Sequence, residues 1–393
     1  MRIAHVISYF QPEFGYEEYY MAREQAAMGH EVHVVTSDRI FPFKNVGKML
    51  SDIGSPYKDR KRPEGVKEVD GFTVHRNRTR MEILYDFMIF RDAARTLSAI
   101  KPDVVHAHGL WPWSTYQAAR NRERIGYGLI LDEHGYATTY DLSKNLRNWV
   151  LDKEYRMIRA PLARYSLKRA DGVVAVSGET EEFLRSFYNC RDVRMIPLGV
   201  DERNFKFDKK KRDRVRRSLG LDDKFVLITA GRLERAKRIE SLIEAVRRIE
   251  SDRIRLVVVG SGDGDYLSEL KKKADGRVVF TGFKRPEELS ELYCGADLAF
   301  FGKASITIRE AMSCSLPLLL FDNEDMRSLL KWDNGTAVRD DPKVLADEIV
   351  RLMDSPGLLK KMGNNGRVIV EAELSNRAEA EKLLDLYASV GFK

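Results

Sequence analysis

Short runs of β-branched and other apolar residues alternate with helical patterns along most of the chain, and this alternation is typical of parallel sheets crossed by helices. The runs expected to form strands are Ile3–Tyr9, Glu31–Thr36, Phe72–His75, Val104–Ala107, Gly128–Leu131, Val173–Val176 and Val193–Ile196, then Phe225–Ala230, Ile254–Gly260, Val278–Thr281, Leu298–Phe301 and Leu318–Phe321. The pattern predicts an α/β protein with two doubly wound, Rossmann-like domains that face each other across a cleft.

With 393 residues, the chain is too long for one compact core. The boundary is expected around Gly199–Asp208, which gives domains 1–203 and 204–374. The segment Ile40–Arg80 is expected to be a long loop with one strand. Helices are expected at Glu17–Met28, Ile239–Arg248, Tyr266–Ala274, Pro286–Cys294, Ile308–Cys314, Pro356–Ala372 and Arg377–Val390.

Composition excludes several classes of protein. Apolar residues make up 43% and charged residues 32%, as in a soluble globular chain. No apolar run approaches the ~18–20 residues that span a bilayer, and the N-terminus lacks signal-peptide features. Three separated cysteines favour a cytoplasmic protein. The net charge of +7 could indicate a nucleic acid partner. The densest basic tract, Lys209–Arg217, has no interleaved aromatic residues on which bases could stack. We therefore expect this tract to form a solvated helix between the domains, and we expect no nucleic acid partner.

The tract Gly231–Lys237 follows a strand and leads into an amphipathic helix. It places Arg232 and Lys237 near a helix N-terminus, where anions are favoured over cations. Cations there make sense if an anion such as a diphosphate lies between them and the helix. The alternative is that both side chains are solvated.

A second strand-to-helix connection contains Ser305, Ile306, Thr307 and Glu310. The amides of the first three are expected at another anion-binding helix end. Glu310, expected in the first helical turn, could accept hydrogen bonds from two ribose hydroxyls. The alternative is a carboxylate that merely favours the helix N-terminus.

Other motifs carry less weight. Gly260–Asp265 resembles a dinucleotide fingerprint but has Asp265 in place of the third glycine, and Asp263 with Asp265 is more typical of a helix cap than of a metal site. His106 and His108 flank Ala107 at a strand end, and we expect one to point inward and the other outward. We find no zinc spacing and no nucleophile elbow.

Taken in order, these motifs resemble those of the retaining glycosyltransferase family 4, which has the two-domain GT-B fold. The resemblance covers nearly the whole chain. It rests on the segments Ile3–Tyr9, Gly29–Val32, Asp103–His108, Ile196–Asp201, Gly231–Lys237, Thr281–Phe283 and Glu310–Met312.

The resemblance implies a role for each matching residue and no metal or other cofactor. Arg232 and Lys237 would hold the donor diphosphate and Glu310 the ribose. The remaining implied contacts are the backbone near Phe283 and Lys284 to the base, the Ile306 and Thr307 amides to phosphate, and Gly15 and His134 to the sugar and phosphate from the first domain. The resemblance also implies that the terminal helix, 375–393, packs back on the first domain.

The chain departs from the family in one important place. The family has two glutamates separated by seven residues; Glu310 fills the second place and Gly302 the first. Lys303–Ser305 replaces the usual glycine-rich loop, and Tyr16 replaces a glycine beside Gly15. Nucleotide binding is therefore better supported than the handling of the sugar.

The leading hypothesis is a metal-independent, retaining transferase that moves a sugar from a nucleotide diphosphate to an acceptor hydroxyl on a glycan or lipid. The catalytic residues would be Arg232, Lys237 and His134. The alternative is a non-catalytic GT-B-like nucleotide-binding subunit. Trp111 and Trp113, with the Ile40–Arg80 segment, could rest on the cytoplasmic face of a membrane, or the two tryptophans could pack inside the domain.

Overall fold

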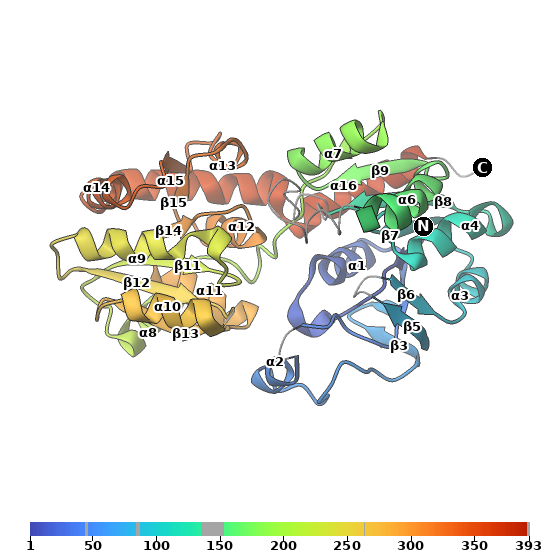
Figure 1. The fold of residues 1–393 in the computed structure, drawn as a ribbon, viewed down its shortest axis with the longest axis horizontal. Coiled ribbons are helices and arrows are strands. Elements are labelled where there is room, and N and C mark those ends of the chain that lie inside the picture. The colour runs from blue at the N-terminus through green and yellow to red at the C-terminus, as the bar shows by residue number, and fades with distance from the viewer. Residues whose placement is uncertain (44–45, 84–86, 135–152, 263, 391–393) are drawn as a thin grey trace. The chain divides into compact units, whose positions relative to one another are not determined.

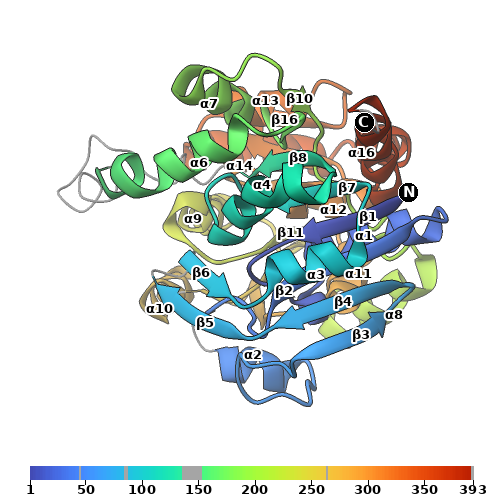
Figure 2. The same cartoon turned by 90° about the vertical axis from the view of Figure 1, so that its right-hand side faces the viewer.

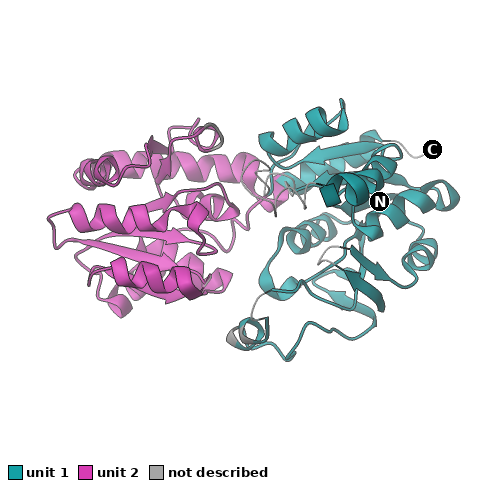
Figure 3. Ribbon diagram, in the orientation of Figure 1, with its two compact units in different colours: residues 1–198, 379–393 teal, residues 199–378 magenta. Residues whose placement is uncertain are grey.

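The computed structural model describes residues 1–43, 46–83, 87–134, 153–262 and 264–390. The chain divides into two compact units, coloured separately in Figure 3. Unit 1 comprises Met1–Leu198 with Glu379–Lys393, and unit 2 comprises Gly199–Ala378. The sequence analysis placed the corresponding boundaries at 203/204 and 374/375.

Unit 1 is built on an eight-stranded sheet of order β10-β9-β8-β7-β1-β2-β4-β3. The strands pair in parallel except β3 and β4, which are antiparallel. The order in which strands are added to the sheet reverses between β1 and β7, because β2 lies on one side of this pair and β8 on the other. The carboxyl ends of β1 and β7 therefore meet at a topological switch point. The strands are β1 (Arg2–Val6), β2 (Glu31–Ser37), β3 (Gly65–Val69), β4 (Phe72–Asn77), β7 (Val104–His108), β8 (Gly128–Glu133), β9 (Gly172–Ala175) and β10 (Arg194–Met195).

Both faces of this sheet are covered, because alternate residues of β1 enter two different cores. Ala4 and Val6 pack with α3 (Ala93–Ile100), α4 (Trp113–Ile125) and α6 (Ala160–Leu167). Ile3, together with Ile7 just after the strand, packs with α1 (Glu17–Ala27) and α16 (Asn376–Ser389). Figure 1 shows α16 above α1, and Figure 2 shows α16 beside α1 and β1, in agreement with their shared core. The helices of unit 1 are α1 (Glu17–Ala27), α2 (Val46–Asp52), α3 (Ala93–Ile100), α4 (Trp113–Ile125), α6 (Ala160–Leu167) and α7 (Gly178–Tyr188), with a small hairpin of β5 (Thr79–Ile83) and β6 (Phe87–Phe90).

The segment Ile40–Arg80 is more ordered than the loop that the sequence predicted, since it contains α2, β3, β4 and the start of β5. The predicted strand at Phe72–His75 is confirmed as part of β4. Strand β3 gave no signal because it lies at the sheet edge and its side chains are largely exposed; Val66 is 67% exposed. An edge strand without a buried face shows no alternation of apolar and polar residues.

Unit 2 is built on a six-stranded parallel sheet of order β13-β12-β11-β14-β15-β16, with its switch point between β11 and β14. Its strands are β11 (Phe225–Ala230), β12 (Ile254–Val259), β13 (Val278–Gly282), β14 (Leu298–Phe301), β15 (Leu318–Phe321) and β16 (Gly335–Val338). Its helices are α8 (Lys209–Leu219), α9 (Ile239–Arg248), α10 (Gly264–Lys273), α11 (Pro286–Gly295), α12 (Ile306–Ser313), α13 (Glu324–Ser328), α14 (Pro342–Met353) and α15 (Pro356–Ile369).

The doubly wound α/β prediction is confirmed, and β11, β14, β15 and α9 have the predicted bounds. The sequence analysis missed β16, in which only Val338 is buried. The basic tract does form a helix, α8, but it belongs to unit 2 and does not lie between the units. Arg212 and Arg216 both pair with Asp297, at 2.5 and 3.2 Å, and these ion pairs anchor the helix on the α11–β14 connection.

The last helix, α16 (Asn376–Ser389), starts where unit 2 ends and continues into unit 1. Leu383, Leu386 and Tyr387 belong to the same core as Ile3 and Met21. None of the helices in the described part of the chain has the length and apolar character needed to cross a bilayer.

Candidate functional site

The loop that follows β11 lies against the loop that follows β12. The Gly231 amide donates to Val259 O at 3.1 Å, and the Leu233 amide donates to Ser261 O at 2.9 Å. A Cβ on Gly260 would lie 1.9 Å from Gly231 O, and one on Gly262 would lie 2.0 Å from Leu233 O. These glycines therefore allow two backbones to touch, which explains the pattern that resembles a dinucleotide fingerprint. Asp263 lies outside the described residues.

Lys237 ends a short 3-10 helix, Arg235–Lys237, and its side chain is only 9% exposed. The chain folds back so that the Lys237 ammonium lies against Gly231; a Cβ on Gly231 would be 2.4 Å from Nζ. Burial lowers the pKa of Lys237, and the nearby cations Lys303 and Arg232 lower it further, against the opposing effect of Glu234 and Glu310. A buried ammonium among like charges is ready to receive an anion.

Arg232 is exposed and makes no hydrogen bond or ion pair with any residue that the structure describes. Its neighbours differ: Arg235 pairs with Glu269 at 2.6 Å, and Arg238 pairs with Asp340 at 2.7 Å. The Arg232 guanidinium thus has no hydrogen-bond or ion-pair partner among the described residues, and it lies close to the buried ammonium of Lys237.

The helix α12 begins two residues earlier than the sequence predicted. Ser305 is its N-cap in an extended conformation, and the Ser305 hydroxyl lies 2.6 Å from the Thr307 hydroxyl. Ile306 and Thr307 are therefore the first two helical residues, whose amides have no acceptor within the helix. The prediction that Glu310 lies in the first turn was wrong: it lies in the second turn.

Two loops converge near Gly231. The position of a Cβ on Gly231 is 3.7 Å from the Thr307 hydroxyl as well as 2.4 Å from the Lys237 ammonium. A helix N-terminus, a hydroxyl and an ammonium therefore meet at the switch point between β11 and β14. Free amides and positive charge at one point are what binding of a phosphate group requires.

Glu310 projects from α12 close enough to Lys237 to influence it electrostatically. The Oε2 atom of Glu310 is buried and has no hydrogen-bond partner among the described residues. Burial raises the pKa of Glu310 to about 7, although Lys237 opposes the change. A buried carboxylate oxygen that lacks a donor can accept one from a ligand hydroxyl.

Gly302, where the family has a glutamate, cannot hold a side chain in this backbone. A Cβ on Gly302 would lie 2.2 Å from the carbonyl oxygen of Lys237 and 3.3 Å from the ring of Phe321. The glycine therefore lets the Lys237 backbone approach the end of β14. The Lys237 backbone can therefore occupy this position only because glycine stands where the family has glutamate.

Phe283 and Lys284 follow β13, and both are half-buried. Lys284 pairs with Glu288 at 3.3 Å. Because β13 is two strands from β11 in the sheet, these residues lie about 10 Å along the same carboxyl edge from the Gly231 loop. That spacing fits a ligand of nucleotide length better than a lone phosphate.

Gly15 and His134 belong to unit 1, so the structure does not bring them together with the unit 2 residues in one described site. Gly15 has φ 65° and closes the turn before α1. His134 Nδ1 lies 3.2 Å from Glu17 Oε1, and its Nε2 lies 3.1 Å from Asp132 Oδ2. Burial alone would lower the pKa of His134, but Asp132 and Glu17 outweigh it and hold that pKa well above the usual value.

The expectation that His106 and His108 point to opposite sides was wrong. Residues two apart on a strand share a face, and the two rings are stacked with centroids 4.5 Å apart. His5, from the adjacent strand β1, joins them with centroids at 5.6 and 5.3 Å. The sequence analysis missed His5, Asp132 and Glu17; the facing positions of His5 and His106 follow only from the pairing of β1 with β7.

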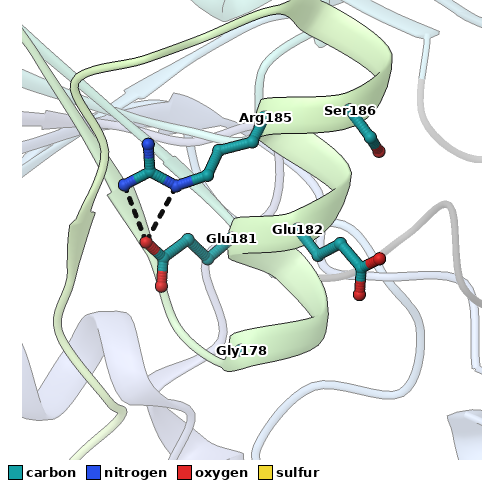
Figure 4. A pocket seen from close by; sticks show the side chains of 5 residues that line it. All are labelled: Gly178, Glu181, Glu182, Arg185 and Ser186. Carbon is teal, nitrogen blue, oxygen red and sulfur yellow. Dashed lines mark hydrogen bonds and ion pairs between the residues drawn. The ribbon is translucent and has the colours of Figure 1, made fainter.

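A surface hollow of about 490 Å³ lies beside α7, and none of the residues discussed above lines it. Figure 4 shows its lining, in which Arg185 bonds Glu181 through Nε and Nη2 at 3.0 and 2.8 Å. The ion pair leaves no uncompensated cation in this lining, since Arg185 is its one basic residue. We therefore place the candidate site at the β11–β14 switch point of unit 2.

Two family models match successive parts of the chain. The family model described as Glycosyltransferase Family 4 matches residues 19–204, and the model described as Glycosyl transferases group 1 matches residues 211–368. An uncharacterized glycosyltransferase of Methanocaldococcus jannaschii is 29% identical over 230 residues, which are 55% of this chain and 59% of that protein.

Other relatives carry more specific names. The alpha-D-kanosaminyltransferase of Streptomyces kanamyceticus is 25% identical over 58% of this chain and 63% of its own length. The alpha-monoglucosyldiacylglycerol synthase of Streptococcus pneumoniae is 29% identical over 43% of this chain and 41% of its own length. The chain thus spans less than two thirds of each of these three relatives.

Solved structures share the fold. Anabaena HepE in complex with UDP superposes with a TM-score of 0.71 at 17% identity, covering 99% of this chain and 100% of that one. The glycosyltransferase WaaG, involved in lipopolysaccharide biosynthesis, gives a TM-score of 0.69 at 18% identity, covering 98% and 99%.

Substitution of Gly302 tests its coupling to Lys237. We expect Gly302→Ala to weaken nucleotide binding about 10-fold, because the new Cβ must displace the Lys237 backbone, a cost of about 1–3 kcal/mol. Isothermal titration with UDP and GDP measures this. Gly276→Ala is the control, since its Cβ meets open space; equal affinities for the two variants would contradict the coupling.

The raised pKa of Glu310 predicts pH-dependent binding. A carboxylate that accepts from two hydroxyls must be ionised, so affinity for a nucleotide sugar should rise as pH increases through about 7. Titrations between about pH 6 and 8 check this, and a nucleotide sugar is the right probe because its diphosphodiester does not ionise in this range.

The matched variant is Glu310→Gln, which keeps the shape but cannot ionise. Its affinity should be lower than that of the unsubstituted protein above pH 7, with the rise across this range abolished. An unaltered rise in the variant would show that another group titrates.

Proposed function

The chain belongs to glycosyltransferase family 4, and from that membership we propose that it transfers a sugar from a nucleotide diphosphate to an acceptor hydroxyl. The single observation that carries the proposal is the buried ammonium of Lys237 beside the unengaged guanidinium of Arg232, at the sheet switch point of unit 2. Open α/β sheets bind their ligands at this place.

The donor would lie along the carboxyl edge of the unit 2 sheet. Lys237, Arg232 and the Ile306 and Thr307 amides would bind the diphosphate, and Glu310 would bind the ribose diol through its unpartnered oxygen. Phe283 and Lys284 would border the base. HepE, which shares the fold, has been solved with UDP and with UDP-glucose, which supports a nucleotide sugar as donor.

Transfer breaks the anomeric C–O bond, and negative charge then accumulates on the departing diphosphate. Arg232 and Lys237 would stabilise that charge, so the donor needs no divalent cation. We propose retention of anomeric configuration: the acceptor hydroxyl attacks the face that the diphosphate leaves, and a phosphate oxygen accepts its proton. We assign His134 a catalytic role from unit 1, because its neighbouring carboxylates favour the charged imidazolium.

The acceptor is proposed to be a glycan or a glycolipid. Relatives that bear the names alpha-monoglucosyldiacylglycerol synthase and alpha-galactosylglucosyldiacylglycerol synthase support the lipid class. The names of these relatives are those of transferases, so they do not favour a non-catalytic nucleotide-binding subunit.

Removal of the free guanidinium should reduce turnover strongly. We expect Arg232→Ala to lower kcat by about 10²–10³-fold, the scale seen when one group that stabilises a developing anion is lost. Release of the nucleotide diphosphate, measured with a panel of UDP- and GDP-sugars and acceptors, gives the rate.

Arg235→Ala is the matched control. Arg235 lies three residues away but is paired with Glu269, so its removal should leave the rate within about twofold if only a surface ion pair is lost. Full activity of the Arg232 variant, or a rate that requires added Mg²⁺, would contradict the assigned electrostatic role.

Membrane contact is a separate proposal. Trp111 is only 5% exposed and packs in the unit 1 core, so it is not available to a bilayer. Met81 and Ile83 are 41% and 44% exposed on β5, near the exposed cations Arg78 and Arg80. We propose that this hairpin rests on an anionic surface.

Flotation with phosphatidylglycerol vesicles tests this contact. The protein should float with the vesicles, and the double variant M81S/I83S should float markedly less. Val66→Ser, which removes another exposed apolar side chain of unit 1, should float as the unsubstituted protein does. Flotation that the double variant leaves unchanged would exclude the hairpin as the contact.

A further inference from the structure

Three buried histidines lie together on one face of the unit 1 sheet. His5 and His106 occupy facing positions on β1 and β7, and His108 follows on the same face of β7. Their exposures are 0%, 0% and 5%. One ring nitrogen of each lies within 4.8 Å of those of the other two. Two histidines spaced by one residue on a strand, with a third on the neighbouring strand, can converge on one point.

The outer nitrogen of each ring is held by an oxygen. His5 Nε2 lies 2.8 Å from Gln25 Oε1, His108 Nδ1 lies 2.6 Å from Asp132 Oδ2, and His106 Nδ1 lies 2.7 Å from the Tyr387 hydroxyl. The amide and carboxylate oxygens only accept, so His5 and His108 donate outward through these nitrogens. Each ring is thereby fixed with its other nitrogen facing the cluster.

The ring nitrogens that face the cluster receive no hydrogen bond when the protons lie on the outer nitrogens. With their protons on the outer side, neutral His5 and His108 direct two lone pairs at each other, from Nδ1 and Nε2 respectively, across 3.1 Å. His106 Nε2 is buried and makes no hydrogen bond to a described residue, although Asp132 Oδ2 lies 3.2 Å from it. Lone pairs that meet in a dry interior repel each other unless a proton or a metal ion lies between them.

We propose that His5, His106 and His108 form a binding site for Zn²⁺, enclosed in unit 1 and independent of the donor site in unit 2. Three imidazoles are a known zinc ligand set, with Zn–N distances near 2.0–2.1 Å. Ligand nitrogens in a tetrahedral site are then about 3.3 Å apart, a spacing that His5 and His108 already have within a few tenths of an ångström.

The outer partners complete the site. A zinc-bound histidine generally donates its other N–H to a carboxylate or carbonyl oxygen, as His108 does to Asp132 and His5 does to Gln25. Tyr387 belongs to α16 and holds His106. The ion would therefore tie the terminal helix to the centre of the unit 1 sheet. Its proposed role is separate from that of Arg232 and Lys237, which provide the charge for the donor diphosphate.

Metal content of the full-length, tag-free protein tests the proposal. After incubation with Zn²⁺ and removal of the excess, mass spectrometry should find about one Zn²⁺ per chain, the stoichiometry of a single three-histidine site. Co²⁺ in its place should give the visible absorption of a four-coordinate complex. Protein that retains no zinc and gives no such absorption would overturn the proposal.

Variants locate the ion. His106→Gln should lose stoichiometric zinc, and Tyr387→Phe should bind it about 10–100-fold more weakly because an outer partner is lost. The matched control is H33Q/H75Q, which removes another pair of histidines in unit 1, 3.1 Å apart but without a third; it should keep the ion. Loss of zinc in this control, or its retention in His106→Gln, would contradict the site.

A thermal measurement remains informative even if a variant fails to fold. An ion that binds only the folded state raises the melting temperature in proportion to its occupancy. Zn²⁺ should therefore raise the Tm of the unsubstituted protein, and a chelator should reverse the rise. A Tm that Zn²⁺ leaves unchanged would count against the site.

Discussion

The position of one ammonium group constrains much of unit 2. Lys237 places its Nζ against Gly231, where a Cβ would be 2.4 Å away, and places its carbonyl oxygen against Gly302, where a Cβ would be 2.2 Å away. Position 302 therefore needs glycine because the contact is with backbone, and position 231 favours glycine because its φ is 119°. The side chain is buried, and a buried cation is costly unless an anion compensates it. Glu234 and Glu310 compensate part of this charge, and under the proposed function the donor diphosphate would add to that compensation.

The close approach of the Lys237 carbonyl oxygen gives a structural reason for glycine at position 302, where the family has glutamate. A glutamate at position 302 would require a different backbone for Lys237, since the conflict is with a carbonyl oxygen and not with a flexible side chain. The missing carboxylate and the close approach of the Lys237 backbone are one structural feature. Lys237, Thr307 and Glu310, to which the proposed function assigns the nucleotide, lie around this feature.

Unit 1 uses the same sheet architecture to bury a different set of polar groups. Asp132 lies at the end of β8, and His106, His108 and His134 all approach its Oδ2 atom, at 3.2, 2.6 and 3.1 Å. Burial would raise the pKa of Asp132, but His108 and His134 hold it well below the usual range. A carboxylate kept ionised in this way fixes several rings at once, which the individual motifs do not reveal.

The sequence by itself determined the alternation of strands and helices, hence the two doubly wound units, because apolar periodicity records which residues are buried. It also placed Arg232 and Lys237 at a strand-to-helix turn, since motif and strand end are adjacent in the chain. Three features were decided only by tertiary structure: the second-turn position of Glu310, the shared face of His5, His106 and His108, and the edge strand β3. Each depends on a cap geometry, a strand register or a partner strand. These are relations between residues distant in the sequence or between backbone groups, and no residue pattern encodes them locally.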